Sequence, residues 1–265
     1  MTVTVERWEG AGNVYLLIDT DELASALTPE TAILLVKLLG GDGVLELSRQ
    51  ADDADVRMRI WNPDGTQSEA CGNGTRMVAR WTAERLGRKA VLVATIAGVL
   101  PCVVSDSAVT AELAPARLAG PQYVPTTDAF PYPHTFVSVG NPHVVILVAD
   151  VTAFPLDHEG PLLEHHPWFP ERVNVEIAQP IDRHHIRMRV WERGVGETAA
   201  CGSGACAVAV AAVEAGIADS PVTVELPGGT LVIDVEANGR VTMHGPAERL
   251  EVIPLPAAVL ALLED

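Results

Sequence analysis

Two cysteines stand out because the same short pattern of small residues follows each of them. Cys71 begins Cys-Gly-Asn-Gly and Cys201 begins Cys-Gly-Ser-Gly, 130 residues further along the chain. A thiolate can take a weakly acidic proton from carbon and a thiol can return one, so paired cysteines suit general acid–base chemistry. Neighbouring glycines let a small ligand approach the backbone. The pattern therefore indicates proton transfer at a carbon atom, with one sulfur on each face.

Each cysteine also stands directly before an apolar stretch with helical spacing, so each is expected at the start of a helix. The first amides of a helix have no partners within it and carry partial positive charge. Such an end binds a carboxylate and lowers the pKa of a thiol from about 8.5 toward neutral. Two such ends would hold an α-amino acid and stabilise the charge that develops as its α-proton leaves. No cofactor and no metal is needed.

The cysteines belong to a longer internal repeat. Residues 57–61 read Arg-Met-Arg-Ile-Trp and residues 187–191 read Arg-Met-Arg-Val-Trp, again 130 residues apart. After each cysteine, a glycine suited to a helix end follows, Gly87 or Gly216. The period is too long for a solenoid. It predicts two similar domains related by a pseudo-two-fold axis.

The elements around the cysteines read alternately as strands and helices. Residues 57–61 alternate basic and apolar side chains, as a half-buried strand does, and residues 62–65 form a turn. Residues 205–215 are apolar nearly all round, which is typical of a buried helix. The predicted fold class is α+β of the α/β type. Each pseudo-symmetric domain would be a β-sheet wrapped around a central helix, with the active site in the cleft between the domains.

The expected domains are residues 1–118 and 119–250. A proline-rich stretch at 120–133 is the natural linker. The 265-residue chain has a formal net charge of −17, which disfavours nucleic acid and anionic membrane surfaces as partners. The N-terminus lacks the features of a signal peptide, and no apolar run is long enough to span a membrane. A cytoplasmic protein with free thiols is expected.

Other interpretations use some of the same residues. The stretch 202–207, Gly-Ser-Gly-Ala-Cys-Ala, matches the dinucleotide fingerprint, but the segment after Cys71 breaks that pattern and the fingerprint does not explain a repeated cysteine. A disulfide between Cys71 and Cys201 would inactivate the protein by oxidation and would not serve to stabilise the fold. Cys102 and Cys206 lack the repeated glycine context and are expected to be small buried residues.

Several segments resemble the signature segments of the diaminopimelate epimerase family, and the resemblance covers essentially the whole chain. These segments are Asn-Pro-Asp-Gly-Thr-Gln-Ser-Glu-Ala-Cys-Gly-Asn-Gly at 62–74, Glu-Arg-Gly-Val-Gly-Glu-Thr-Ala-Ala-Cys-Gly-Ser-Gly at 192–204, Gly-Ala-Gly-Asn at 10–13, Gly-Asn-Pro-His at 140–143, Phe-Pro-x-x-Val-Asn at 169–174 and Met-His-Gly-Pro-Ala at 243–247. Proline racemases match less well around the second cysteine. The resemblance implies conversion of LL- to meso-diaminopimelate without pyridoxal phosphate, for lysine and peptidoglycan-precursor synthesis. It also implies that residues 251–265 return to complete the first domain.

The resemblance also implies a role for each matching residue. Cys71 and Cys201 would exchange the proton, and His143 and Glu192 would help to set thiol ionisation. Four residues at the helix starts would bind the reacting carboxylate: Gly72, Asn73, Gly202 and Ser203. The rest of the substrate would meet Asn13, Gly43, Asn62, Asn141, Asn174, Glu192 and Arg193. A guanidinium suits a distal carboxylate because it binds in a bidentate way. Asn62 could equally cap its own turn, and the other asparagines could bond to the backbone.

Three positions differ from the usual family pattern. Val14-Tyr15 stands where Asp-Phe is usual, which leaves the exact substrate open. Gly43 stands where glutamine is often found, although glycine is a common alternative there, and an aromatic residue that supports dimerisation in some members is replaced near Glu251. A racemase for another amino acid on the same scaffold is the alternative. A non-catalytic amino-acid-binding protein is a third, which the two cysteines disfavour. The expected partners are a small-molecule substrate, diaminopimelate, and a second copy of the chain.

Overall fold

The structure is a computed structural model in which the described residues are 3–23, 25–51, 53–68, 71–113, 115–118 and 129–264. The chain forms two units. The first unit combines residues 1–111 with residues 245–265, and the second unit comprises residues 112–244. The boundaries expected from the sequence lie seven and six residues further along, after residues 118 and 250. Most of the expected linker, 120–133, lies outside the described residues.

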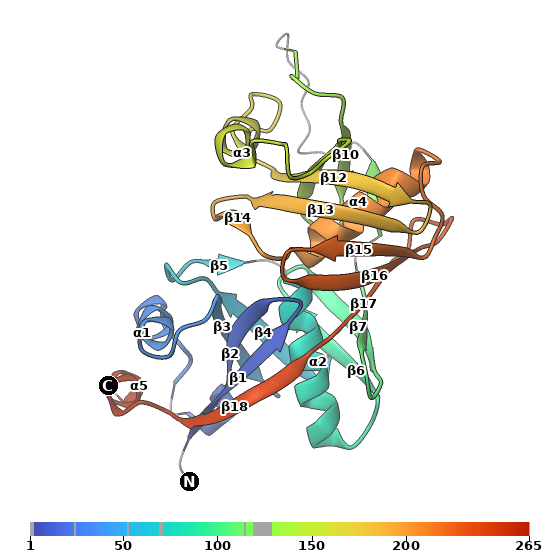
Figure 1. Ribbon diagram of the computed structural model, residues 1–265. Helices are drawn as coiled ribbons and strands as arrows, with labels where there is room; N and C mark the ends of the chain where they lie inside the picture. Colours follow the sequence, from blue (N-terminus) through green and yellow to red (C-terminus); the bar gives the residue numbers. More distant parts are fainter. Residues whose placement is uncertain are drawn as a thin grey trace. The chain divides into compact units, whose positions relative to one another are not determined.

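The first unit is built of strands around one long helix, α2. Strand β18 pairs antiparallel with β1, which brings the C-terminal segment into the same unit as the N-terminus (Figure 1). Its elements are β1 (Thr4–Gly10), β2 (Asn13–Asp19), the 3-10 helix η1 (Thr20–Glu22), α1 (Pro29–Leu39), β3 (Gly43–Ser48), β4 (Val56–Trp61), β5 (Gln67–Ser68), α2 (Gly72–Leu86), β6 (Ala90–Thr95), β7 (Gly98–Val104), β8 (Val109–Glu112), β18 (Glu248–Pro254) and α5 (Ala257–Glu264).

The second unit repeats this plan around helix α4. Its elements are β9 (Arg117–Leu118), β10 (Thr135–Ser138), β11 (Pro142–Leu147), α3 (Leu156–Glu164), β12 (Asn174–Asp182), β13 (His185–Glu192), β14 (Gly196–Thr198), α4 (Gly202–Glu214), β15 (Val222–Leu226), β16 (Gly229–Val235) and β17 (Val241–Gly245). From β1 to β8 and from β10 to β17 the order of strands and α-helices is the same. The predicted duplication is therefore confirmed at the level of elements.

The pairing of the strands repeats as well. In each unit a parallel pair, β2 with β3 or β11 with β12, continues into an antiparallel partner, β4 or β13. The strand that pairs with the outer edge of the first hairpin comes from a different part of the sequence in each unit. Strand β1 pairs with β18 from the end of the chain, whereas β10 pairs with the short β9 just before it.

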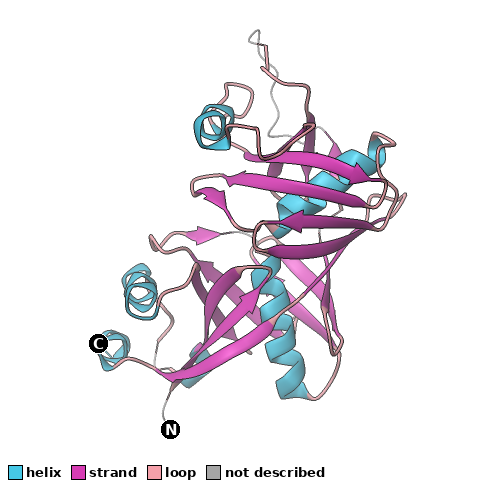
Figure 2. Cartoon of the chain, in the orientation of Figure 1, coloured by secondary structure: helices cyan, strands magenta, loops and turns pink. Residues whose placement is uncertain are grey.

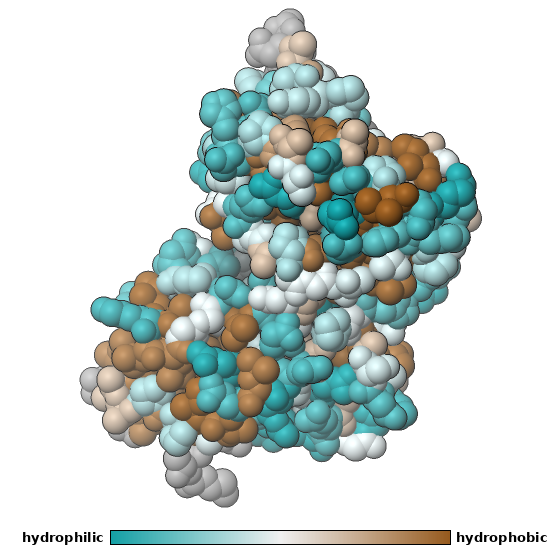
Figure 3. Space-filling view, viewed as in Figure 1, coloured by the Kyte–Doolittle hydropathy of each residue, from teal (hydrophilic) through white to brown (hydrophobic). Residues whose placement is uncertain are grey.

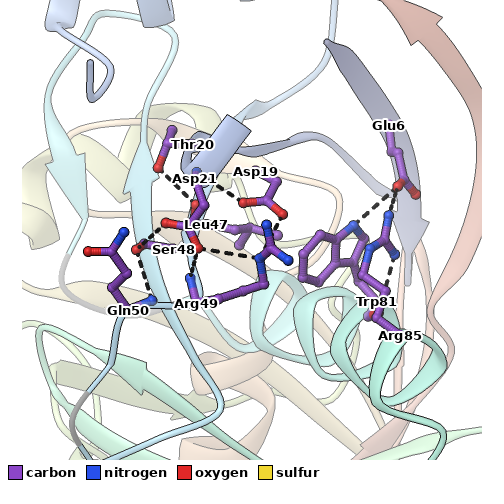
Figure 4. Close-up of polar contacts among 10 residues, drawn as sticks. All are labelled: Glu6, Asp19, Thr20, Asp21, Leu47, Ser48, Arg49, Gln50, Trp81 and Arg85. Carbon is purple, nitrogen blue, oxygen red and sulfur yellow. Dashed lines mark hydrogen bonds and ion pairs between the residues drawn. The ribbon is translucent and has the colours of Figure 1, made fainter. Parts of the chain in front are cut away.

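Helix α2 begins and ends where its sequence predicts. Cys71 is its N-cap, and Gly87 closes it with φ of 65°, a left-handed conformation that glycine adopts without strain. The helix packs against β1, β2, β3, β4, β6 and β7 (Figure 2). Trp81 donates from Nε1 to Glu6 on β1 over 3.2 Å, and Arg85 also donates to Glu6 (Figure 4). These contacts fix α2 to the sheet and so fix the position of Cys71.

Helix α4 is the central helix of the second unit. Cys201 is its N-cap, and its following residues are Gly, Ser, Ala, Cys and Val, nearly all of them buried. It packs against β10, β11, β12, β13, β15 and β16. Small side chains let the strands approach a helix closely from every side. The predicted α+β class, with a central helix in each half, is confirmed.

Apolar side chains fill a core in each unit. In the first unit, strands β1 to β3 pack against helices α1 and α5, and in the second, strands β10 to β12 pack against α3 and the aromatic side chains around it. Apolar side chains also gather on the outer surface over α1 and α5 (Figure 3). Among the described residues, no helix is both long and apolar enough to cross a membrane.

Candidate functional site

Cys71 lies at the start of α2 with its sulfur turned back over the first turn of the helix. The residue is extended, with φ of −145° and ψ of 106°, and Sγ accepts a hydrogen bond from the Gly74 amide over 3.2 Å. The thiol also lies 3.5 Å from the Tyr15 hydroxyl, with the S–H donating to the phenol oxygen. A hydroxyl can both accept and donate, so Tyr15 can serve the thiol and the thiolate.

Gly43 is what makes room for Tyr15 beside Cys71. A Cβ at position 43 would collide with the carbonyl oxygen of Trp61 and would lie 2.9 Å from Cε1 of Tyr15. The two residues pair directly in the parallel ladder between β2 and β3. From the sequence, Gly43 was expected to bind substrate, and Tyr15 stood out only as a departure from the family pattern. In the structure, a side chain at position 43 would meet the Trp61 carbonyl and the Tyr15 ring.

Asn13 and Asn73 are joined by their side chains in the first unit. Asn73 donates from Nδ2 to Oδ1 of Asn13, and its own Oδ1 accepts from the buried Arg76 over 2.8 Å. Asn13 also donates to Asp42 over 3.3 Å, and Asp42 accepts from the Val14 amide over 2.8 Å. A carboxylate from the loop before β3 thus lies next to Asn13, although residue 14 itself is a valine. The group ties β2 to the first turn of α2.

Asn62 is engaged in its own turn. Its Nδ2 donates to Thr66 over 2.9 Å, and its Oδ1 accepts from Ser68 over 3.1 Å. These contacts close the hairpin from β4 to β5 that precedes Cys71. They are the contacts expected of the turn-capping alternative, and binding of substrate by Asn62 stays a prediction.

Cys201 has the same position on α4 but a different chemical environment. Its Sγ accepts from the Gly204 amide over 3.4 Å and lies 3.5 Å from the Ser203 hydroxyl. Burial raises the pKa of the Cys201 thiol well above its ordinary value, and the charges of Glu192 and Glu176 raise it further. The hydrogen bonds from Ser203 and Gly204 oppose this rise. The expectation that the Cys201 pKa falls toward neutral is wrong, because desolvation outweighs the effect of the helix amides.

Glu192 is the carboxyl group in contact with Cys201. It accepts hydrogen bonds from Cys201 and from the hydroxyl of Thr198. Burial raises the pKa of Glu192, and those two hydrogen bonds reduce the rise. The Cys201 proton therefore lies between a sulfur and a carboxyl group whose pKa values are both raised.

His143 belongs to a chain of polar groups that leads to Cys201. It is fully buried, and its Nδ1 lies 2.7 Å from Oε1 of Glu176, which is also fully buried. Its Nε2 lies 2.9 Å from Oδ1 of Asn141, whose Nδ2 donates to the Ser203 hydroxyl over 3.3 Å. Ser203 in turn lies beside Cys201. The structure therefore brings His143, Asn141 and Ser203 together as a group.

Glu176 was not found by sequence reasoning. It lies in the first half of β12, in a run of five buried residues that reads Asn-Val-Glu-Ile-Ala. Burial raises the pKa of the Glu176 carboxyl, and the charge and hydrogen bond of His143 oppose this. A charged residue inside an apolar strand is rare unless it is paired, and that was the sequence signal available.

Asn174 and Arg193 are linked through the backbone. Asn174 donates to the Pro142 carbonyl over 2.9 Å and accepts from the Arg193 amide over 2.9 Å. The Arg193 guanidinium donates to the Glu171 carbonyl over 3.2 Å. Asn174 therefore positions the turn that carries Arg193. Gly72 and Gly202 are the first residues of α2 and α4.

The four cysteines, Cys71, Cys102, Cys201 and Cys206, are free thiols. Burial raises the pKa of Cys102 to about 12, as expected of a small buried residue. Among the described residues, no group of three His, Cys, Asp or Glu side chains is arranged to hold a metal ion.

Comparison with known proteins identifies one family. The family model described as diaminopimelate epimerase matches residues 8–118 and 135–250. The chain is 40% identical over 272 residues to a diaminopimelate epimerase of Synechococcus elongatus, covering 94% of this chain and 97% of that protein. It is 40% identical over 270 residues to a diaminopimelate epimerase of Magnetococcus marinus, covering 95% and 97%.

Solved structures share the fold at much lower identity. A predicted epimerase from Pseudomonas aeruginosa has a TM-score of 0.75 and 18% identity, covering 96% of this chain and 99% of that chain. A hydroxyproline epimerase from Agrobacterium vitis has a TM-score of 0.68 and 12% identity, covering 97% and 93%. These likenesses support the two-domain α+β fold.

Proposed function

Since the chain belongs to the diaminopimelate epimerase family, we propose that it interconverts LL- and meso-diaminopimelate by moving the α-proton between Cys71 and Cys201. The observation that carries this proposal is that each unit presents a free thiol as the N-cap of its central helix. Inversion at carbon needs a base on one face and an acid on the other. Two thiols supply both without a cofactor. The protein is accordingly an isomerase.

Cys201 is suited to begin the cycle as the proton donor. Its raised pKa, due first to burial and then to the nearby carboxylates, keeps it protonated near neutral pH. Cys71 then acts as the base that takes the α-proton. After one turnover the protonation states of the two sulfurs are reversed, and the opposite direction uses the reversed roles. Glu192 accepts the Cys201 hydrogen bond and so holds the thiol in its donor state.

The helix starts supply the groups for the reacting carboxylate. The Gly74 and Gly204 amides are bonded to the sulfurs. The amides of the first two residues of each helix come before these, and we assign them to the carboxylate: Gly72, Asn73, Gly202 and Ser203. Their partial positive charge stabilises the electron density that moves onto the carboxylate as the α-proton leaves. This interaction strengthens in the transition state, so it lowers the barrier and not merely the Michaelis constant.

The far end of the substrate needs a second set of groups. Diaminopimelate carries an amino acid head at each end, and Arg193 supplies a positive charge for the distal carboxylate. Asn174 holds the Arg193 backbone. The remaining predicted contacts, from Asn13, Gly43, Asn62 and Asn141, keep their role in the proposal as groups that line or shape the substrate site.

The biological setting follows from the family. Diaminopimelate is a precursor of lysine and peptidoglycan, and reactive thiols persist in the reducing cytoplasm, where we place the protein. The substrate is a small amino acid. The net charge of −17 disfavours nucleic acid and anionic membranes as partners. We also propose that two copies associate and that the two units correspond to the two expected domains.

Proton exchange tests the proposal directly. Reduced protein is incubated in D2O with LL-diaminopimelate and, in parallel, with lysine, ornithine, histidine and glutamate, and α-proton loss is followed by NMR. Exchange with inversion on diaminopimelate, lost in Cys71→Ala and in Cys201→Ala, is the expected result. Exchange only on another amino acid would retain the two-thiol chemistry and overturn the substrate assignment. Folded, reduced protein that exchanges none of them would overturn the proposed function.

A further inference from the structure

The two units place different residues at equivalent positions behind their cysteines. Ile60 and Val190 are equivalent in the internal repeat, and they pair with Leu45 and Glu176 respectively. A Cβ on Gly74 would meet the Leu45 side chain, and a Cβ on Gly204 would meet Glu176 at 2.8 Å from Oε1. Leu45 and Glu176 therefore occupy the same position in the repeated fold.

The equivalence extends one strand further. Leu45 pairs with Leu17 on β2, and Glu176 pairs with Val145 on β11. Two residues before these stand Tyr15 and His143. The first unit therefore carries Tyr15 and Leu45 at the positions where the second unit carries His143 and Glu176. The first unit folds with leucine at this position and not with a carboxyl group.

The polar groups around Glu176 fix the protons of His143. Glu176 Oε1 contacts Nδ1, and its buried Oε2 has no hydrogen-bond partner among the described residues. The titratable groups that face this carboxyl are His143, Glu192 and Cys201. Nε2 lies 2.9 Å from Oδ1 of Asn141, an oxygen that can only accept a hydrogen bond, so Nε2 carries a hydrogen in this arrangement. Nδ1 of the neutral ring then accepts from a protonated Glu176, and burial favours that protonated carboxyl group.

A hydrogen on Nε2 fixes the direction of the hydrogen bonds that lead from His143 to Cys201. Nε2 donates to Oδ1 of Asn141, whose Nδ2 donates to Ser203. The Ser203 hydroxyl is then free to donate to the Cys201 sulfur, 3.5 Å away. If Nε2 lacked its hydrogen, Asn141 would have to turn its amide and accept from Ser203, and the sulfur would lose this donor. A donated hydrogen bond favours the thiolate over the thiol.

We propose that Glu176 is a positioning residue that holds His143 with Nε2 protonated, so that Asn141 and Ser203 deliver a hydrogen-bond donor to the Cys201 thiolate. This inference deepens the proposed function and rests on it. It makes the two halves of the reaction unequal, because Tyr15 and Leu45 stand in the first unit at the positions that His143 and Glu176 occupy in the second. Asn141 does not relay a proton, because its amide only orients its hydrogen bonds with His143 and Ser203.

The protons of His143 can be observed without any activity. In protein labelled with 15N-histidine, the ring nitrogens of His143, assigned with a His143→Gln variant, report which nitrogen is protonated. Wild type and Glu176→Gln should both show a hydrogen on Nε2, because a glutamine amide can donate to Nδ1 and leave Nε2 protonated. Glu176→Leu introduces the residue that stands at the equivalent position 45. This variant should no longer hold the His143 ring in one protonation state. A His143 that carries its hydrogen only on Nδ1 in the wild type would overturn the proposal.

Kinetics separate positioning from packing. Glu176→Leu should lower kcat for diaminopimelate by about tenfold or more, as loss of a hydrogen bond to a charged sulfur predicts, and Glu176→Gln should restore most of that loss. Glu46→Gln removes another buried carboxylate, which bonds to Arg59 and Trp61, and should lower the melting temperature without changing the His143 signals. Equal kcat in wild type and Glu176→Leu, or a Gln variant as slow as Leu, would overturn the inference. If the wild type does not exchange diaminopimelate, the proposed function fails, and the nitrogen signals alone decide the arrangement of His143.

Discussion

The hydroxyl of Tyr15 lies 3.5 Å from the sulfur of Cys71. This contact depends on Gly43, since any side chain there would collide with the Trp61 carbonyl and press on the Tyr15 ring. The first departure from the family pattern, at residues 14 and 15, and the second, at residue 43, are thus one structural feature. Together they place a phenol beside one of the two sulfurs that we propose to exchange the proton.

Tyr15→Phe removes only the hydroxyl, so it tests that contact with little change in packing. The Cys71 thiolate would keep the Gly74 amide as a donor but lose the Tyr15 hydroxyl. Cys71 should therefore ionise at higher pH, and the pH profile of its alkylation by iodoacetamide, measured by peptide mass spectrometry, should shift upward by about one unit. The rate at Cys201 in the same sample is the internal control. An unchanged Cys71 profile in folded protein would show that the contact does not influence the sulfur.

Much of the scaffold around these sulfurs was predictable from local pattern. Cys-Gly-x-Gly before an apolar run predicts a helix start, and the repeated Arg-Met-Arg segments predict the strands β4 and β13, because capping and alternation depend on near neighbours in sequence. The lowered pKa at Cys201 was predicted wrongly. Ionisation depends on desolvation and on Glu176 and Glu192, which the fold brings together from separate strands.

Tyr15 and Glu176 escaped sequence reasoning for the same physical reason. Each lies next to its partner only through strand pairing between segments that are far apart in the chain, as Tyr15 and Gly43 do. A single sequence gives no register for such pairs. By contrast, the alternative role of Asn62 was visible because its partners, Thr66 and Ser68, are within six residues.

Glu192→Gln should make Cys201 more reactive toward alkylation. A negative carboxylate near a thiol opposes thiolate formation, so removing it lowers the thiol pKa. Burial is the larger cause and remains, so the Cys201 pKa should stay above its ordinary value. Alkylation of Cys201 at pH 8 should be several-fold faster in the variant, while Cys71 provides the reference. A slower Cys201 would contradict the assigned electrostatics.

The same carboxyl group should make stability depend on pH. Burial raises the pKa of Glu192 in the folded state above its value of 4.5 in the unfolded chain. The folded protein therefore binds this proton more tightly, and its stability falls as pH rises through the interval between the two values. Glu192→Gln should flatten that fall. Melting temperatures of both proteins from pH 4.5 to 8 check this, and parallel curves would argue against it.

Glu6 should contribute to the stability of the first unit and not to proton transfer. It accepts from Trp8, Trp81 and Arg85, and only 6% of it is exposed. Glu6→Ala leaves these donors without their partner and should cost about 3 kcal/mol of unfolding free energy. Denaturant unfolding measures the loss. Glu112→Ala, which removes an exposed pair with Arg240, is the matched control and should cost less than about 1 kcal/mol.

Arg193 should act on binding of the distal carboxylate and not on proton transfer itself. Its charge lies on the turn that Asn174 holds, outside the group of residues around the sulfur. A contact made equally in the ground state and the transition state raises KM when it is lost and leaves kcat nearly unchanged. Arg193→Met should therefore raise KM for diaminopimelate about tenfold or more, as loss of a charged hydrogen bond predicts. Arg183→Met, which removes a surface pair with Asp219, should leave KM unchanged. A fall in kcat at constant KM would instead place the Arg193 contribution in the chemical step.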